Sequence, residues 1–380
     1  MSKIPIIVIG TLVLGALNSL FTKYQDNQCV KNCENPDLST HRYFEQPAVQ
    51  TLQMFLGELG IFFVYYLCYK SPFSRRQTGM STETEAPSHL KFGQSIKLSI
   101  PAILDLTATS LMNIGLLYIP VSIYQMTRGA VVLFVAILSV LFLQTHVRKL
   151  EWVALAFVTL GVALVGFSGT TSSGPSDDNA APKVVFGIVL VILAVSLQAL
   201  QFVAEEHILK DRSIVPLKVV YNEGFYGTII LTFFMIVLNY IFAAIYSEKQ
   251  FENSPFNLRE SFSQVFKSKE IIISSIFIMI SISTFNFCGV SITHMLSATA
   301  RTTIDTCRTL VVWLVALILG WESFSFLQCF GFALLVFGTL CFNGALTPED
   351  WEFVPIFLKE RDFMSISTHP GSLDTEELSP

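Results

Sequence analysis

The sequence predicts an all-α polytopic membrane protein, with ten transmembrane helices arranged as two inverted five-helix repeats around a central cavity. Hydrophobic residues make up 52% of the 380 residues and charged residues only 14%, whereas soluble proteins carry about 25% charged residues. The apolar residues gather in blocks of about 20, the length that crosses ~30 Å of hydrocarbon as a helix. The few charges inside these blocks recur at corresponding places in the two halves of the chain.

The apolar blocks follow one another along the whole chain. They cover about residues 4–21, 48–69, 98–118, 123–143, 151–168, 184–204, 221–246, 271–291, 297–319 and 325–346. The first block follows a single early lysine, Lys3, and no convincing cleavage site follows it. We therefore interpret this block as a membrane helix rather than a cleaved signal peptide. The alternative interpretation, that it is a signal anchor, stays open.

The blocks divide into five and five. We expect a first five-helix repeat at 1–169, a flexible linker at 170–182, a second repeat at 183–346 and a flexible cytosolic tail at 347–380. Because five is odd, the second repeat must enter the membrane in the opposite orientation, as in many secondary transporters. The linker and the tail are rich in Ser, Thr, Gly, Pro and acids, so neither predicts a separate catalytic domain.

The orientation follows from the distribution of Lys and Arg. These residues are more frequent after the second, fourth and sixth blocks and near both ends than after the first, third, fifth and seventh blocks. Since cytoplasmic loops carry the excess of Lys and Arg, both termini are expected in the cytosol.

The ninth block carries three charges, Arg301, Asp305 and Arg308. A charge near the bilayer centre costs roughly 2.5–3.5 kcal/mol, so these side chains need partners or a wet cavity. Asp305 and Arg308 are three residues apart and can pair on one helix face. Arg128 in the fourth block lies at the place that corresponds to Arg308.

Arg128 and Arg308 are the leading candidates for solute binding. In a hydrated cavity, each offers a planar fork of donors to a carboxylate or phosphate. The alternative is an arginine that a neighbouring acid neutralises and that only clamps helices. For Arg128 the expected acid would be Asp105 or Glu58.

Uncharged polar residues near these arginines are further candidates. Tyr124 and Gln125 precede Arg128, and Asn113 and Asn286 lie in the third helix expected for each half. Each can bind a solute or join two helices by a hydrogen bond, and both interpretations stay open.

Several acids lie within or at the ends of the blocks. Glu58, Asp105 and Glu223 are candidates for proton coupling, because intramembrane acids commonly relay protons in transporters. Glu205 and Glu206 lie near the expected end of the sixth helix, where we expect them to be solvated and paired.

The seven cysteines have no spacing typical of a metal site, and neither a metal nor a cofactor is expected. Cys29 and Cys33 lie together in the first loop. They can form a disulfide if that loop faces an oxidising lumen. The short gap between them permits the bond without requiring it.

Three runs of residues point to a known family. Ser122–Arg128 (SIYQMTR), Leu296–Arg308 (LSATARTTIDTCR) and Gly320-Trp321-Glu322 resemble the F subfamily of solute carrier family 35. That group belongs to the drug/metabolite transporter superfamily, beside the nucleotide-sugar transporters, and the resemblance covers nearly the whole membrane portion. It implies ten helices in two inverted repeats and a location in the lysosomal or vacuolar membrane. The Golgi or another endomembrane is the second choice of location. It implies no particular substrate.

We therefore expect a secondary transporter that moves a small polar or charged metabolite across an intracellular membrane by alternating access. The expected partners are a small-molecule solute and membrane lipid; a homodimer is left open, and no basic patch suggests nucleic acid. The alternative is a non-transporting membrane adaptor that binds a protein partner. No motif of an intramembrane enzyme, such as HExxH, is present.

Overall fold

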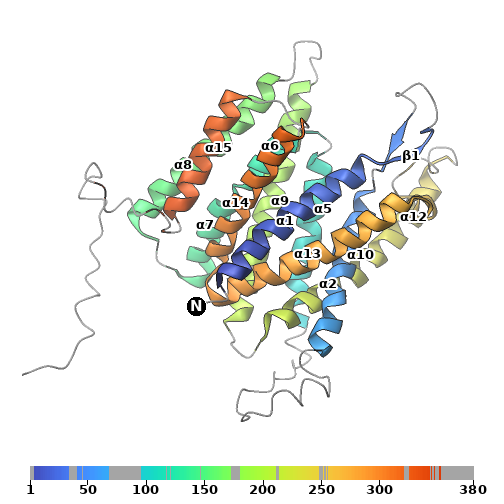
Figure 1. Ribbon diagram of the computed structural model, residues 1–380, viewed down its shortest axis with the longest axis horizontal. Coiled ribbons are helices and arrows are strands. Elements are labelled where there is room, and N and C mark those ends of the chain that lie inside the picture. The colour runs from blue at the N-terminus through green and yellow to red at the C-terminus, as the bar shows by residue number, and fades with distance from the viewer. Residues whose placement is uncertain are drawn as a thin grey trace, which may run out of the picture.

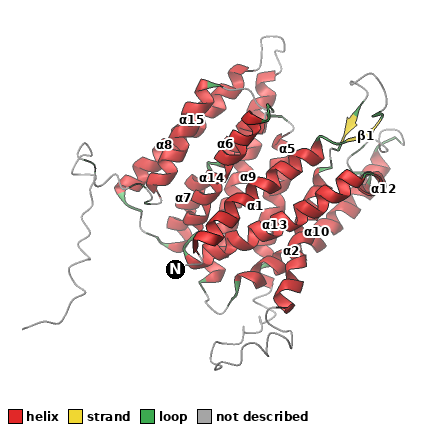
Figure 2. Ribbon diagram, in the orientation of Figure 1, coloured by secondary structure: helices red, strands yellow, loops and turns green. Residues whose placement is uncertain are grey.

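The computed structural model is almost entirely helical in the part of the chain that it describes (Figure 2). It describes residues 4–33, 41–44, 46–67, 96–116, 118–119, 121–145, 147–172, 180–210, 214–247, 251, 254, 256–320, 325–342, 344, 346 and 351. The strands in this part are a short antiparallel pair, β1 (Cys29–Lys31) and β2 (Arg42–Tyr43).

The helices coincide with the expected apolar blocks, except α12 (Leu258–Lys267), which lies in the segment expected as a loop between two blocks. The first half forms α1 (Ile4–Asp26), α2 (Pro47–Tyr65), α5 (Ser99–Leu116), α6 (Val121–Arg128), α7 (Val131–Leu143) and α8 (Lys149–Ser172). The second half forms α9 (Ala180–Leu209), α10 (Pro216–Ile245), α12 (Leu258–Lys267), α13 (Lys269–Met295), α14 (Ala298–Ile318) and α15 (Phe326–Phe342).

Two boundaries differ from the expectation. The fourth block is not one continuous helix, because a turn at Gly129 and Ala130 separates α6 from α7. The linker is shorter than 170–182, since α8 continues to Ser172 and α9 begins at Ala180. Apart from Trp351, the expected tail at 347–380 lies outside the described residues.

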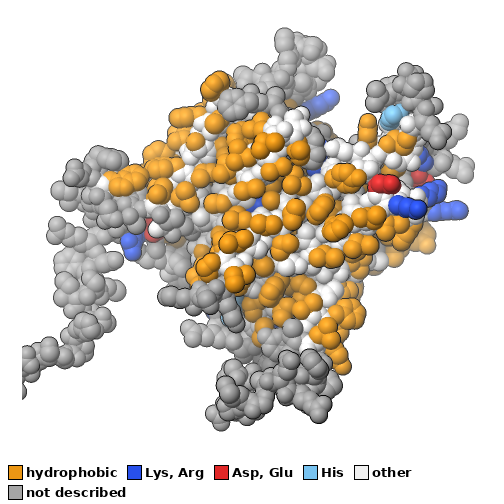
Figure 3. Space-filling model, in the orientation of Figure 1, with side chains coloured by type: hydrophobic (Ala, Val, Ile, Leu, Met, Phe, Trp, Pro, Cys, Tyr) orange, Lys and Arg blue, Asp and Glu red, His pale blue; other side chains and the backbone are white. Residues whose placement is uncertain are grey.

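Within the described residues, seven helical stretches are long and apolar enough to cross a membrane. They are Ile4–Asp26, Pro47–Tyr65, Ser99–Leu116, Met126–Leu143, Pro182–Leu209, Pro216–Ile245 and Lys269–Met295. Figure 3 shows hydrophobic side chains over most of the visible described face, while charged side chains gather at the end where β1 and α12 lie. The chain is therefore an all-α polytopic membrane protein.

The most extensive helix contacts join the two halves of the chain. They pair α8 with α15, α2 with α10, α1 with α13, and α5 with α9, and Figure 1 shows α8 beside α15 and α1 beside α13. A Cβ atom at Gly161 of α8 would lie 2.5 Å from the carbonyl oxygen of Gly331 of α15. Small residues that permit such close approach drive helix packing in lipid.

A disulfide and an ion pair organise the segments at one end of the bundle. Cys29 and Cys33 are bonded, with 5.9 Å between their Cα atoms. Lys31 Nζ lies 2.9 Å from Glu260 Oε1 and thereby joins β1 to α12. The hydrogen bond from Lys31 holds the pKa of Glu260 below its usual value, so Glu260 stays ionised near neutral pH.

Candidate functional site

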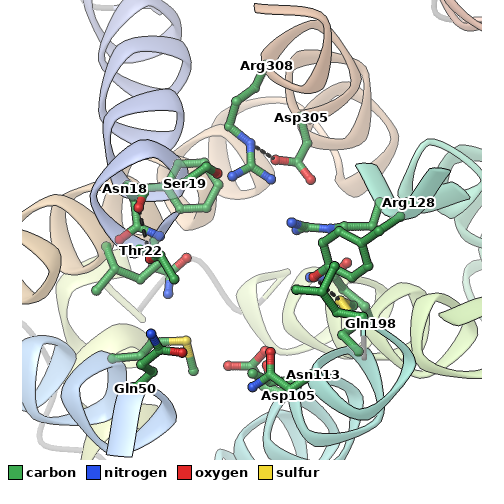
Figure 4. A pocket seen from close by; sticks show the side chains of 18 of the residues that line it. Asn18, Ser19, Thr22, Gln50, Asp105, Asn113, Arg128, Gln198, Asp305 and Arg308 are labelled. Carbon is green, nitrogen blue, oxygen red and sulfur yellow. Dashed lines mark hydrogen bonds and ion pairs between the residues drawn. The ribbon is translucent and has the colours of Figure 1, made fainter. Parts of the chain in front are cut away.

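A cavity of about 350 Å³ lies between helices of both halves. Its walls come from α1, α2, α5 and α6 in the first half and from α9, α13 and α14 in the second. Figure 4 shows that polar side chains from several of these helices enter the same space. The volume is at the low end of the range for small-molecule sites, about 300–1,000 Å³.

Arg308 enters the cavity from α14 together with Asp305. The expected pair forms, with Arg308 Nε 2.8 Å from Asp305 Oδ1. Arg308 Nη1 also donates to the carbonyl oxygen of Gly15 at 3.4 Å, and the guanidinium lies 4.8 Å from the ring centroid of Phe285. A Cβ atom at Gly15 would overlap the Arg308 side chain, so this glycine gives the arginine its path into the cavity.

Arg128 reaches the cavity from the last turn of α6, just before the turn that separates α6 from α7. Its guanidinium lies 5.8 Å from the ring centroid of Tyr124. Among the described residues, no carboxylate lies within ion-pair distance of Arg128, and its Nε has no hydrogen-bond partner. Asp105 lines the same cavity, but within the described part of the chain neither it nor Glu58 forms an ion pair with Arg128.

A second buried ion pair lies deeper in the cavity wall. Arg301 of α14 is paired with Glu205 of α9, and the two side chains are only 6% and 0% exposed. Gln201 donates to the other carboxylate oxygen of Glu205 at 2.9 Å, and the ring centroid of Phe202 lies 4.0 Å from the guanidinium. The two charges are thus almost fully buried, and each one compensates the other.

The solvated role expected for Glu205 is wrong, because α9 continues to Leu209 and carries Glu205 a turn inside the bundle. Glu206 is also engaged within the protein: it accepts a hydrogen bond from the backbone N–H of Ala298 at 2.7 Å. Since Ala298 is the first residue of α14, Glu206 satisfies a free donor at that helix start.

The α9 face toward the cavity is the part of the site that the sequence prediction missed. Gln198, Gln201 and Phe202 line the cavity, and Glu205 lies one turn beyond. Gln198, Gln201 and Glu205 are separated by three and four residues, so they share one helix face. This polar stripe in an otherwise apolar run was the signal that could have found it.

The other candidate side chains are divided between the cavity and the helix contacts around it. Asp105, Asn113, Tyr124 and Asn286 line the cavity. Asn113 and Tyr124 also make weak contacts with neighbouring side chains, to Thr51 Oγ1 at 3.5 Å and to Met112 Sδ at 3.6 Å. Gln125 lies on α6, but its side chain is outside the described part of the structure.

Glu58 and Glu223 lie outside the cavity wall, where α2 packs against α10. Their residues are only 2% and 6% exposed. A Cβ atom at Gly224 would lie 2.7 Å from Cβ of Glu58, so the two acids are neighbours across this helix contact. Asn286 donates a hydrogen bond to Glu58 and also lines the cavity. The described residues provide no partner for Glu58 Oε2 or Glu223 Oε1.

Several buried polar atoms on residues that line the cavity have no hydrogen-bond partner within the described part of the chain. They are Arg128 Nε, Arg308 Nη2, Gln198 Oε1 and Gln201 Oε1. Buried polar groups in folded proteins are nearly always satisfied, by protein, by water or by a ligand. The arrangement therefore offers both donors and acceptors to a polar solute.

Comparison with known proteins places these features in a family. The nucleotide-sugar transporter family matches residues 38–252. Solute carrier family 35 member F6 of Mus musculus is 35% identical over 89% of this chain and 87% of its own length. An uncharacterised protein of Schizosaccharomyces pombe is 34% identical over 90% of this chain and 97% of its own. A solved crystal structure, with 11% identity and a TM-score of 0.55, covers 90% of this chain and 96% of that one and is similar in fold.

Proposed function

Since the chain belongs to the F subfamily of solute carrier family 35, within the nucleotide-sugar transporter family, we propose that it moves a small polar or charged metabolite across an intracellular membrane by alternating access. The observation that carries this proposal is the pair of guanidinium groups, Arg128 and Arg308, directed into a cavity that both halves of the chain enclose (Figure 4). The family is one of transporters rather than enzymes.

The helix contacts support an arrangement of two related halves. We count α6 and α7 as one span and leave out the short α12, so that each half of the described chain has five. The first helix of one half then packs on the third of the other, in both directions: α1 on α13, and α9 on α5. The second helices, α2 and α10, pack on each other, and so do the fifth, α8 and α15. Exchanging the halves leaves this pattern unchanged, as expected for inverted repeats that rock about a shared site.

The two arginines are suited to an anionic group on the solute. Among the described residues, Arg128 has no carboxylate partner, and Nη2 of Arg308 has no hydrogen-bond partner beside the ion pair with Asp305. In a cavity at membrane depth, charge-assisted hydrogen bonds are stronger than in water. A carboxylate or phosphate between these groups would therefore gain both charge compensation and directed donors.

The disulfide supports an orientation with both termini in the cytosol. Cys29 and Cys33 lie in the connection between α1 and α2, and disulfides persist in oxidising compartments. If this connection faces a lumen, the start of α1 lies on the cytosolic side. We propose that the protein is located in a lysosomal or vacuolar membrane. The Golgi or another endomembrane is the second choice of location.

Uptake into liposomes tests the proposed function. We expect the purified full-length chain in sealed liposomes to take up at least one solute from pools of labelled small metabolites, with saturable kinetics, because a carrier has a finite number of sites. Empty liposomes and liposomes with heat-unfolded protein are the controls. Absence of protein-dependent uptake from every pool of anionic, cationic and amphoteric metabolites would contradict a transport function.

Coupling to protons through Glu58 and Glu223 is a further part of the proposal. Both acids are buried without a basic partner in the described residues, and such intramembrane acids commonly form proton relays. The charged groups around them are Asp105 from α5, Glu205 from α9 and Arg301 from α14. Asn286 joins Glu58 to the cavity, so occupancy of the cavity can influence this acid.

An imposed pH gradient across the liposome membrane tests the coupling. We expect the gradient to change the initial uptake rate of the wild type several-fold, and Glu58→Gln together with Glu223→Gln to remove that response while uptake without a gradient persists. Glu260→Gln is the matched control, since Glu260 lies on α12, is not among the residues that line the cavity, and stays ionised beside Lys31. Wild-type uptake that ignores the gradient would exclude proton coupling.

A further inference from the structure

The charges of the cavity point to the kind of solute that fits it. We infer that the solute is amphoteric, with an anionic group that binds Arg128 and Arg308 and a cationic group that binds Asp105. This inference rests on the proposed transport function and names the class of its substrate.

Most of the strong charges around the cavity are already compensated by other side chains. Arg308 is paired with Asp305, and Arg301 with Glu205. At the rim, Asp26 accepts a hydrogen bond from Gln50 at 2.6 Å. Within the described part of the chain, three charged residues that line the cavity have no ion-pair partner within 4.0 Å: Lys23 in the last turn of α1, and Arg128 and Asp105. The assignment rests on Arg128 and Asp105, and Lys23 adds a second cation to the lining.

These two residues have opposite charges and enter the cavity from different helices, Arg128 from α6 and Asp105 from α5. In Figure 4, Asp105 lies beside Asn113, on the side of the cavity away from Arg308 and Asp305. The anion-binding groups and the acid are thus on different walls of one small space. A solute that spans this space meets cationic groups at one end and a carboxylate at the other.

Charge balance favours an amphoteric solute over a simple anion. A purely anionic solute would pair with Arg128 but would bring a second negative charge near Asp105 at membrane depth, where unpaired charges are costly. A purely cationic solute would pair with Asp105 but would bring a second positive charge near Arg128. An amphoteric solute supplies a partner to both residues and adds no net charge to the cavity.

The uncharged part of the lining agrees with this assignment. Asn113 is beside Asp105. The side-chain oxygens of Gln198 and Gln201 have no hydrogen-bond partner in the part of the chain that the structure describes, and they can accept hydrogen bonds from an ammonium group. Phe202, Phe285 and Met112 supply apolar surface to the same cavity. With a volume of about 350 Å³, the cavity suits a metabolite of the size of an amino acid or a small peptide.

One peptide library in three chemical forms tests the inference. Dipeptides with free termini are amphoteric, their N-acetylated forms are anions, and their C-amidated forms are cations. The readout is the thermal unfolding midpoint of the purified full-length protein in detergent, since a ligand that binds the folded state raises it. We expect the free form to stabilise the wild type at concentrations about tenfold lower than the acetylated form does.

Asp105→Asn should remove this preference. Loss of a hydrogen bond to a charged group weakens binding of the free form roughly 10- to 100-fold, whereas binding of the acetylated form stays the same or becomes tighter. Glu260→Gln also replaces an acid by its amide, but outside the cavity. This variant should keep the wild-type preference for the free form over the acetylated form. If Asp105→Asn fails to fold, the three forms compared on the wild type decide the question alone.

The inference is overturned if the free form gives no stabilisation, if wild type is stabilised equally by the free and acetylated forms, or if Asp105→Asn retains the preference. These outcomes are distinct from failure of the proposed function. Uptake of purely anionic or cationic solutes alone would leave transport intact and refute the amphoteric class, whereas uptake of nothing would refute transport itself.

Discussion

Replacing Arg301 by glutamine is expected to lower the free energy of unfolding by about 3–5 kcal/mol, because it leaves the carboxylate of Glu205 buried without its cation. Glu205 is fully buried, and among the described residues its remaining hydrogen-bond partner is the amide of Gln201. The measurement is denaturant unfolding of the purified protein in mixed micelles, followed by its intrinsic fluorescence.

The double variant, Glu205→Gln with Arg301→Gln, separates the ion pair from the packing. Removing both charges takes away the uncompensated carboxylate, so the double variant should recover most of the stability that Arg301→Gln loses. The matched control is Arg259→Gln, an exposed arginine on α12, which should change stability by less than about 0.5 kcal/mol. Equal stability of Arg301→Gln and the wild type would show that the pair does not hold α9 to α14.

Replacing Arg128 by glutamine is expected to reduce uptake of the transported solute by about 100-fold or more while leaving the fold intact. Two lost hydrogen bonds to a charged group account for an effect of that size. No ion pair is broken, because among the described residues no acid is paired with Arg128. The measurement is the initial rate of uptake into liposomes, with the unfolding midpoint recorded for the same preparation.

Arg128→Lys gives a graded comparison, since lysine keeps the charge but lacks the planar fork of donors. It should retain more uptake than Arg128→Gln and less than the wild type. Arg259→Gln again serves as the control on the outside of the bundle. An Arg128→Gln protein that is fully folded and transports at the wild-type rate would exclude Arg128 from the solute site.

The sequence predicts much of the fold, because hydrophobic blocks of membrane-spanning length are a strong signal. The expected Asp305–Arg308 pair also forms, since three-residue spacing brings side chains together on any helix. Helix ends were less predictable. The expected end of the sixth block missed the last turn of α9, and this error contributed to the expectation that Glu205 is solvated.

Partners between distant helices could not be predicted from local spacing. Arg301 and Glu205 are 96 residues apart, and their pairing depends on how α14 packs against α9. The same holds for Asn286, which binds Glu58 of α2. The isolation of Arg128 is also a tertiary property: Asp105 lies in the same cavity without being close enough to pair with it.

Solute exchange across sealed liposomes tests most directly whether the cavity carries solute alternately to the two sides. Liposomes are loaded with unlabelled solute from the uptake screen, diluted into labelled solute, and compared with unloaded ones. We expect internal solute to accelerate entry of the label and to produce transient accumulation, and Arg128→Gln to abolish both. Alternating access through this cavity would be contradicted if labelled solute entered at the same rate with and without internal solute, and if that rate were unchanged in Arg128→Gln.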